Sequence, residues 1–218
     1  RVNIIIDGNE DLLDLQAGSE SLMLANRIKL ENFTALSTIA GDTAGIRLRW
    51  NNWDELQYRG NIHARAEATR KSPDKSPHID LHILPSTFVA NDTQWSLQNS
   101  TVSLDSNSVK FDNVNIYHKN EFIRVNGVLS GSSNDVLNIA FNRFNIANLN
   151  GIANPSGYHL GGILNGNANL SNVSSQPLFT SILKIDSLMV NYQMLGNMEI
   201  NSSWNDHKKA IELDAYAL

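Results

Sequence analysis

Val136-Leu-Asn-Ile-Ala-Phe141 shows the pattern that decides the fold of this chain. Leu137, Ile139 and Phe141 fall on every second residue, and Asn138 stands between two of them. Successive side chains of a β-strand point to opposite faces of the sheet. This period of two therefore predicts a strand with one apolar and one more polar face.

The same alternation recurs along the chain, separated by turn-forming residues at intervals of roughly 8 to 14 residues. It is found in Ile79/Leu81/Ile83, Val102/Leu104, Val109/Phe111, Val114/Ile116, Ile123/Val125/Leu129, Leu160/Leu164/Ala168 and Met198/Ile200. The pattern predicts an all-β fold in which a long antiparallel meander forms one sheet. Open sheets of more than about ten strands tend to curl. We therefore expect the sheet to roll into an elongated, β-taco-like trough with an apolar inner face; a closed sandwich or barrel is the alternative.

The exceptions to this pattern are few and short. Residues 33–44 and 146–153 do not fit the strand pattern, and they are too short and too weakly periodic for more than a turn or two of helix. Loop 71–77 is rich in proline and charge. We expect residues 1–218 to form one elongated sheet segment, with possible subunits 1–70 and 78–218 joined by that loop. Since both ends of the chain lie in or near strand-like sequence, we also expect a segment of a longer polypeptide.

Composition excludes several classes of function. The 218 residues carry a net charge of −5, and no basic run is present, which argues against a nucleic-acid partner. Cysteine is absent, so disulfides and thiolate metal sites are excluded. Glycine motifs for nucleotides and for serine hydrolases are absent as well. We expect a protein that is not an enzyme and needs no cofactor.

One short stretch has the residue types of a metal site. His78, Asp80 and His82 point to the same side of a predicted strand, where two imidazoles and a carboxylate could meet a metal ion. The alternative is a solvated polar face opposite Ile79 and Leu81. Because the sequence suggests no fourth ligand, we predict no metal and keep these three residues as a weak candidate.

Several phrases, in their order, resemble a known family. They are Leu84-Pro-Ser-Thr-Phe-Val-Ala-Asn-Asp-Thr-Gln-Trp95, Val125-Asn-Gly127, Asp135-Val-Leu-Asn-Ile-Ala-Phe141 and Leu160-Gly-Gly-Ile-Leu-Asn-Gly166, with a weaker similarity from Leu48 to Gly60. This stretch is similar to the mid-to-C-terminal part of the Bacteroidetes-type TamB (translocation and assembly module) family, and more distantly to AsmA-like envelope proteins.

The resemblance implies a place and a role. Family members are anchored in the inner membrane of Gram-negative bacteria and cross the periplasm as a rolled β-sheet. They work with an outer-membrane barrel of the Omp85 type in outer-membrane protein assembly and in moving phospholipid along an apolar groove. The family has no catalytic residues to carry over, and its membrane anchor would lie in parts outside this segment.

The residues and the resemblance together suggest an apolar groove that solvates phospholipid acyl chains. Its candidate lining residues are Ile123, Val125, Leu129, Leu137, Ile139, Phe141, Leu164, Leu183 and Ile185. Two other functions stay open: a scaffold or chaperone whose sheet edges pair with barrel strands, and a carbohydrate-binding or adhesin module that uses exposed aromatic rings.

Overall fold

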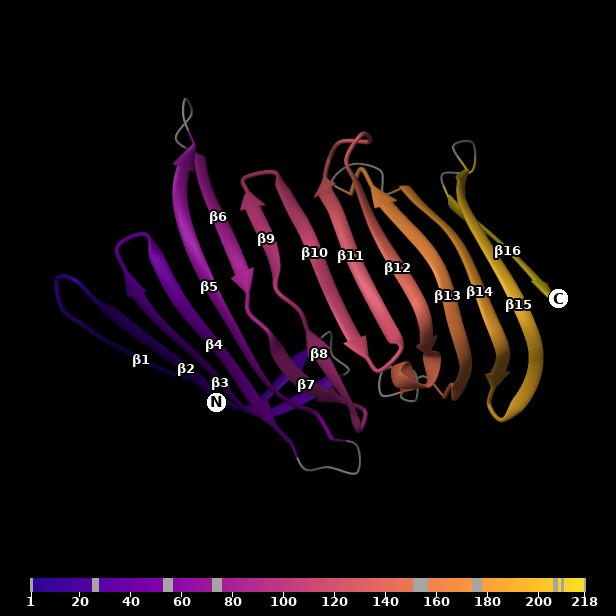
Figure 1. Cartoon of the computed structure of the whole chain (residues 1–218), viewed down its shortest axis with the longest axis horizontal. Coiled ribbons are helices and arrows are strands. Elements are labelled where there is room, and N and C mark those ends of the chain that lie inside the picture. The colour runs from indigo at the N-terminus through magenta and orange to yellow at the C-terminus, as the bar shows by residue number, and fades with distance from the viewer. Residues whose placement is uncertain are drawn as a thin grey trace. The chain divides into compact units, whose positions relative to one another are not determined.

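A computed structural model of the chain describes residues 2–24, 28–52, 57–71, 76–150, 157–173, 178–205, 208 and 210–217. These residues form antiparallel strands and one short 3-10 helix, which confirms the predicted all-β fold (Figure 1). None of the helices formed by these residues is long and apolar enough to cross a bilayer. The chain divides into two compact units, residues 1–106 and 107–218.

The described residues of the first unit form nine strands. They are β1 (Val2–Gly8), β2 (Leu13–Leu24), β3 (Ile28–Ala40), β4 (Thr43–Asn51), β5 (Arg59–Lys71), β6 (Ser76–Ile83), β7 (Ser86–Ala90), β8 (Thr93–Leu97) and β9 (Ser100–Asp105). Their order in the sheet is β1-β2-β3-β4-β5-β6-β9. β5 also pairs with β7 through its first residues, and β7 pairs with β8, so a small hairpin branches from the sheet beside β6.

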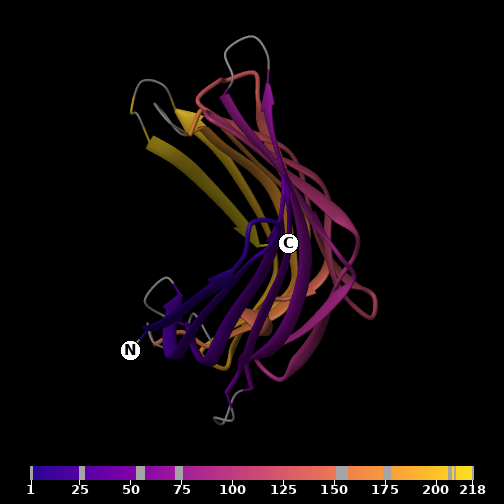
Figure 2. The ribbon, with the colours of Figure 1, turned by 90° about the vertical axis from the view of Figure 1, so that its left-hand side faces the viewer.

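The described residues of the second unit form seven strands and the 3-10 helix. They are β10 (Ser108–His118), β11 (Glu121–Ser130), β12 (Val136–Asn145), η1 (Ile146–Leu149), β13 (Leu160–Ser171), β14 (Leu178–Val190), β15 (Gln193–Asn205) and β16 (Ala210–Ala217). Each strand pairs with the next along the chain. The long strands β13 to β15 bend along their length (Figures 1 and 2).

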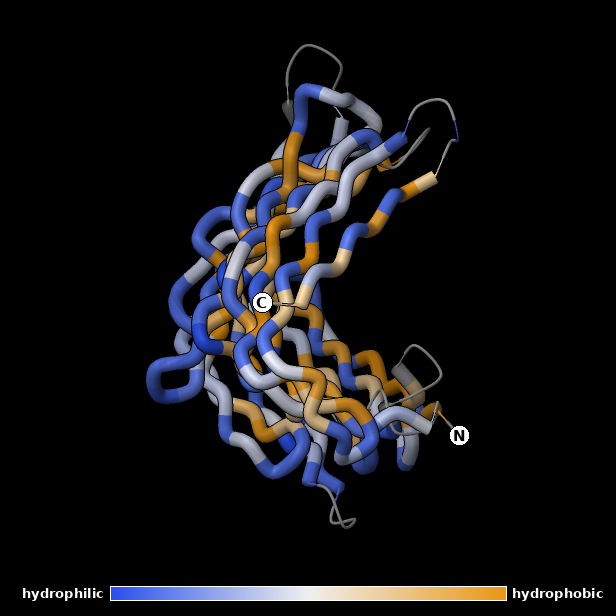
Figure 3. Tube along the Cα trace, turned by 90° about the vertical axis from the view of Figure 1, so that its right-hand side faces the viewer, coloured by the Kyte–Doolittle hydropathy of each residue, from blue (hydrophilic) through white to orange (hydrophobic). Residues whose placement is uncertain are grey.

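The described strands of each unit form a single layer. Its strands contact their sheet neighbours, and η1 packs against β13. Within either unit, the described residues form no second sheet or helical layer over a face of the strands. Hydrophobic and hydrophilic residues alternate along the strands (Figure 3), as the period of two predicts.

One expected helical stretch is wrong. Residues 33–44 form the end of β3, a turn and the start of β4, because Thr34–Ala40 pair with Thr43–Arg49. Gly41 has a φ of +55°, which suits the first position of a two-residue hairpin turn. The alternation is weak here because the face that is apolar elsewhere carries Ser37, while Leu36 lies on the opposite face.

The other two irregular stretches have separate outcomes. Residues 146–149 form η1, capped by the Asn145 side chain, which accepts a hydrogen bond from the Ala147 N–H; residues 151–153 lie outside the described residues. Loop 71–77 is shorter than expected, since Lys71 ends β5 and Ser76 begins β6; residues 72–75 are not described. This loop joins two paired strands of the first unit, and the division between the compact units falls at 106/107.

Candidate functional site

All the predicted groove residues lie on one face of the second unit. In one row across the strands, Ile123 pairs with Phe141, and Gly166 pairs with both Phe141 and Leu183. Because directly paired residues share a face of the sheet, these side chains point the same way. We call this surface the apolar face of the second unit.

Parallel rows on the same face hold the other predicted residues. Val125 pairs with Ile139 in the next row. Leu137 and Leu129 lie in further rows, beside Gly127 and Val109 respectively. Leu164 pairs with Ile185 at the other end of the face. The whole set thus shares one face of the sheet, as the alternation predicts; its role as a lipid groove stays a prediction.

The apolar face is the more buried one, although the part of the unit that the structure describes places no layer over it. Leu137, Leu164 and Ile185 keep only 6%, 8% and 8% of their surface exposed. On the polar face, Ile182, the chain neighbour of Leu183, is 63% exposed. Since the described residues of this unit form no second layer, the side chains of the apolar face bury one another, as expected where a bent sheet brings them together.

Two glycines on this face allow close approach of neighbouring strands. Gly127 and Gly166 have φ values of +115° and +127°, where other residues are strained. A Cβ at either position would lie 2.1 Å from a carbonyl oxygen, that of Val136 or Ile182 respectively. Phe141 pairs with Gly166, and Phe111 pairs with Gly127. An aromatic residue thus stands beside each gap that a glycine leaves on the face.

The structure adds residues that sequence reasoning did not include. Phe144 belongs to the apolar face although it stands three residues after Phe141, because a β-bulge between them shifts the register. Its ring lies 6.0 Å from that of Phe141. At the bulge, Arg143 has a φ of +49°, a conformation that arginine rarely adopts. The sequence therefore gives no indication of a bulge at this position.

A buried polar pair also lies on this face. The hydroxyls of Ser181 and Ser202 are 2.8 Å apart and hydrogen-bonded, and the two residues keep 5% and 7% of their surface exposed. Each satisfies the other, so the cost of burying them is small. Ala168 pairs with Ser181 in the same row. This part of the row therefore carries small side chains and lies between rows of larger aliphatic residues.

The polar face of the second unit is rich in asparagine. Asn126 pairs with Asn138, and Asn138 pairs with Asn169. The Asn138 amide donates a hydrogen bond of 2.8 Å to Asn169 Oδ1. Such ladders of amides link neighbouring strands through their side chains. The 29 asparagines of the chain are thus used, in part, as a sheet-stabilising surface.

The first unit has an apolar face of the same kind but with smaller side chains. Ile46 pairs with Ala64, and Ala64 with Ile83; beside this row, Ala44 pairs with Ala66. Ala64 is buried, at 9% exposure, whereas Ile6, which ends the same row on the end strand β1, is 66% exposed. The row thus runs from a covered centre to an uncovered end.

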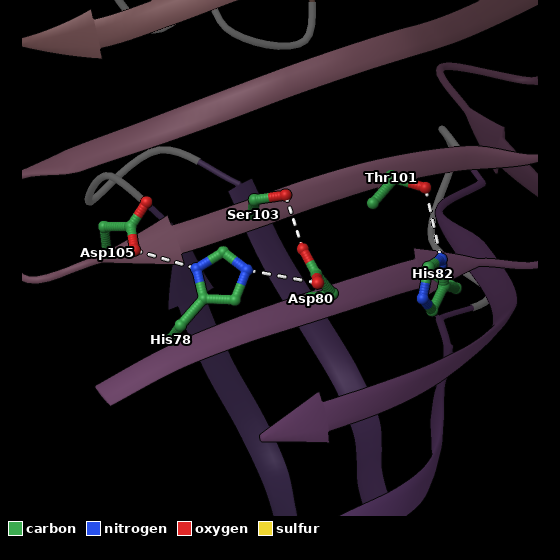
Figure 4. A network of polar contacts seen from close by, with 6 residues as sticks. All are labelled: His78, Asp80, His82, Thr101, Ser103 and Asp105. Atoms are coloured by element: carbon green, nitrogen blue, oxygen red, sulfur yellow. Dashed lines mark hydrogen bonds and ion pairs between the residues drawn. The ribbon is translucent and has the colours of Figure 1, made fainter. Parts of the chain in front are cut away.

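The weak metal candidate is part of a hydrogen-bonded network on the polar face of the first unit (Figure 4). His78 contacts Asp105 at 2.8 Å through Nδ1 and Asp80 at 3.1 Å through Nε2. His82 instead contacts the Thr101 hydroxyl at 3.2 Å. Among the described residues, no group of three His, Asp or Glu side chains is arranged to hold a metal ion. The three residues share a face as expected, but β9 supplies their partners.

The same network lowers the pKa of Asp80. The Ser103 hydroxyl donates a hydrogen bond of 2.5 Å to Asp80 Oδ1. This bond, more than the neighbouring His78, holds the pKa of the Asp80 carboxyl below its usual 3.8. Asp80 is therefore a carboxylate over the whole neutral range, and it fixes one side of the His78 ring.

Two of the described tryptophans pack against the sheet. Trp95 is only 4% exposed. The Trp50 ring covers Gly60, where a Cβ would come within 2.3 Å of it. Trp53 lies outside the described residues.

Comparisons of the chain with protein-family models, with curated proteins and with solved structures found no match. The resemblance to the TamB family therefore stays a prediction that depends on the quoted phrases and their order.

Proposed function

We propose that this chain is a non-enzymatic segment of an envelope-spanning translocation and assembly protein, and that its apolar face holds phospholipid acyl chains. One observation carries the proposal. The second unit has a continuous apolar sheet face, and its described residues form no second layer over that face. Sheets normally bury such a face against another layer. Here six of the nine predicted residues keep part of their surface exposed, which is apolar surface that a partner or a lipid can cover.

The size of the face suits an acyl chain. The row through Ile116, Ile123, Phe141, Gly166, Leu183 and Ile200 crosses six strands, β10 to β15. At about 4.8 Å between strands, it extends roughly 24 Å. One leaflet of a bilayer has a hydrocarbon thickness of about 15 Å, half of the whole core. An acyl chain can therefore lie along the row over its full length.

The energetic reason is the hydrophobic effect. Each methylene removed from water contributes about 0.8 kcal/mol, so a continuous apolar track lets a lipid leave one membrane without exposing its chains. In this proposal the bent sheet is one stretch of a trough in the periplasm of a Gram-negative bacterium. The longer protein supplies the inner-membrane anchor and meets an Omp85-type barrel at the outer membrane.

Adjacent residues on β14 give a sharp test. Leu183 lies on the apolar face, and its neighbour Ile182 is on the polar face. A photo-crosslinking amino acid at position 183 should give lipid adducts after irradiation in the envelope, detected by mass spectrometry. The same amino acid at position 182 is the matched control. Equal labelling at both positions, or none at 183, would contradict the proposal.

A second variant tests loading. Leu183→Asn and Ile139→Asn place amides at half-buried positions of the apolar face, and we expect the double variant to lose most co-purified phospholipid. Ile182→Asn should retain it. Circular dichroism and thermal unfolding confirm that each variant is folded before the lipid is quantified.

The end strands favour a second candidate function, pairing with the strands of outer-membrane proteins. Among the described residues, β1 pairs only with β2, and Val2, Ile4 and Ile6 are 64–68% exposed. An apolar edge of this kind adds strands readily. Ile4→Lys and Ile6→Lys should then abolish binding of unfolded barrel segments and leave lipid loading unchanged; unchanged binding would exclude this edge.

A further inference from the structure

A cavity of about 650 Å³ lies in the first unit, at the branch where β5 leaves β6 for β7. A single row of the polar face crosses it: Thr34 pairs with Arg49, Arg49 with Asn61, and Asn61 with Thr87. Arg59 lies in the next row, paired with Asn51. The cavity thus joins side chains of β3, β4, β5 and β7 that are far apart in the sequence.

The cavity is locally positive in an acidic chain. Arg49 and Arg59 line it, and none of its lining residues is a carboxylate, although the chain has a net charge of −5. The Arg49 side chain is exposed and makes no hydrogen bond or ion pair with another described residue. A guanidinium presents five N–H donors in a planar fork that fits phosphate or carboxylate oxygens.

The neighbouring groups complete a donor-rich site. Arg47 Nε donates to Asn61 Oδ1 at 3.0 Å, so the Asn61 NH2 group is the part of this amide left for a ligand acceptor. The Thr34 and Thr87 hydroxyls border the same space. Asn32 and Asn51 also line the cavity, and the Asn32 side-chain NH2 donates a hydrogen bond of 3.1 Å to the Asn51 carbonyl oxygen.

From these groups we propose that the cavity binds a phosphate ester of a sugar or of glycerol. The two guanidinium groups fit the charge of a phosphate monoester. The volume falls in the 300–1,000 Å³ range typical of small-molecule sites, far more than phosphate itself needs. The amide and hydroxyl groups around the arginines suit the hydroxyls of the organic part. This site lies on the polar face of the first unit, so it is independent of the apolar face in the second.

Titration with defined probes tests the site. Glycerol 3-phosphate and glucose 6-phosphate should shift the backbone amide NMR signals of β4, β5 and β7 and saturate. Glucose, glucuronate and inorganic phosphate should bind at least 10-fold more weakly. Vesicles containing phosphatidylglycerol, compared with phosphatidylcholine alone, show whether a lipid headgroup competes for the same site; competition identifies a lipid source, and its absence a soluble one.

Three variants test whether Arg49 and Arg59 bind the phosphate ester. Arg49→Gln and Arg59→Gln should each weaken sugar-phosphate binding about 10-fold or more, with unchanged melting temperature because both side chains are exposed. Arg124→Gln is the matched control, an exposed arginine on the polar face of β11. Equal weakening in all three variants, equally tight binding of inorganic phosphate, or no saturable binding of either ester would overturn the proposal. None of these outcomes bears on the crosslinking at position 183.

Discussion

The two units use the same strand pattern but build their polar faces from different chemistry. In the second unit, asparagine side chains line up across neighbouring strands, as in the Asn126–Asn138–Asn169 ladder. The first unit uses ionisable groups: the His78–Asp80 pair and the arginines of β4 and β5. Amide ladders respond weakly to pH and salt, whereas charged networks respond to both.

The apolar faces differ as well. In the second unit, large aliphatic residues such as Leu164 and Ile185 pair directly, and two glycines let the strands approach. In the first unit, alanines alternate with isoleucines, as in the Ile46–Ala64–Ile83 row. The difference teaches that the period of two sets which residues share a face, while side-chain volume sets how well that face covers itself.

The largest expected effect is at a glycine of the second unit. Gly166→Ala forces a Cβ against the Ile182 carbonyl oxygen at a φ of +127°, and should lower the free energy of unfolding by about 3–5 kcal/mol. Gly45→Ala in the first unit is the control. Its Cβ would meet nothing closer than 4.0 Å, so a change within about 1 kcal/mol is expected. Urea denaturation measures both, and similar losses would refute the close approach at Gly166.

The next effect compares a covered with an uncovered apolar position. Leu164→Ala removes a side chain that is 8% exposed and should cost about 2–4 kcal/mol. Ile4→Ala on β1, at 68% exposure, should cost less than about 0.5 kcal/mol. Equal costs in chemical denaturation would show that the apolar face of the second unit does not bury itself.

The network around Asp80 should make the free energy of unfolding depend on pH in the acid range. The pKa of Asp80 is lowered by folding, so its contribution is complete above the unfolded-state pKa and is lost as pH falls through the folded-state value. Ser103→Ala removes the main cause and should raise this pKa toward 3.8. An NMR titration of the Asp80 carboxyl carbon from about pH 6 to about pH 2 follows it. A pKa unchanged by the substitution would rule out Ser103 as the cause.

The smallest effects are pairwise couplings. A double-mutant cycle on Asn138 and Asn169, which share a hydrogen bond of 2.8 Å, should give about 0.5–1 kcal/mol. The cycle on Arg65 and Glu67, an exposed ion pair of 3.2 Å, should give about 0.2–0.5 kcal/mol at low salt and less at high salt. A larger coupling for the ion pair would reverse the comparison between the two polar faces.

Much of the candidate apolar face was predictable because alternation is a local property. Leu137, Ile139 and Phe141 share a face whichever strands lie beside them. Phe144 was missed because a bulge breaks the period. The helical expectation for residues 33–44 failed because small and polar residues blurred the period, and pairing between β3 and β4 decided the structure.

The cavity lined by Arg49 and Arg59 could not be predicted from the sequence, for a different reason. Thr34, Arg49 and Thr87 become neighbours only through the register of β3, β4, β5 and β7. The same holds for His78. The sequence correctly placed His78, Asp80 and His82 on one face of a strand, but Asp105, which contacts His78, comes from β9. Contacts between strands depend on which strands pair and in which register, and neither is encoded in a single strand.

By itself, the sequence determined the all-β class, the antiparallel meander and the two chemical faces, since side-chain alternation along a strand needs no partner. Only the tertiary structure decided the branch at β5, the bulge before Phe144 and the gathering of Arg49 and Arg59 at one cavity. These features arise from pairing across strands, where hydrogen-bond register and close backbone approach, rather than local pattern, set the geometry.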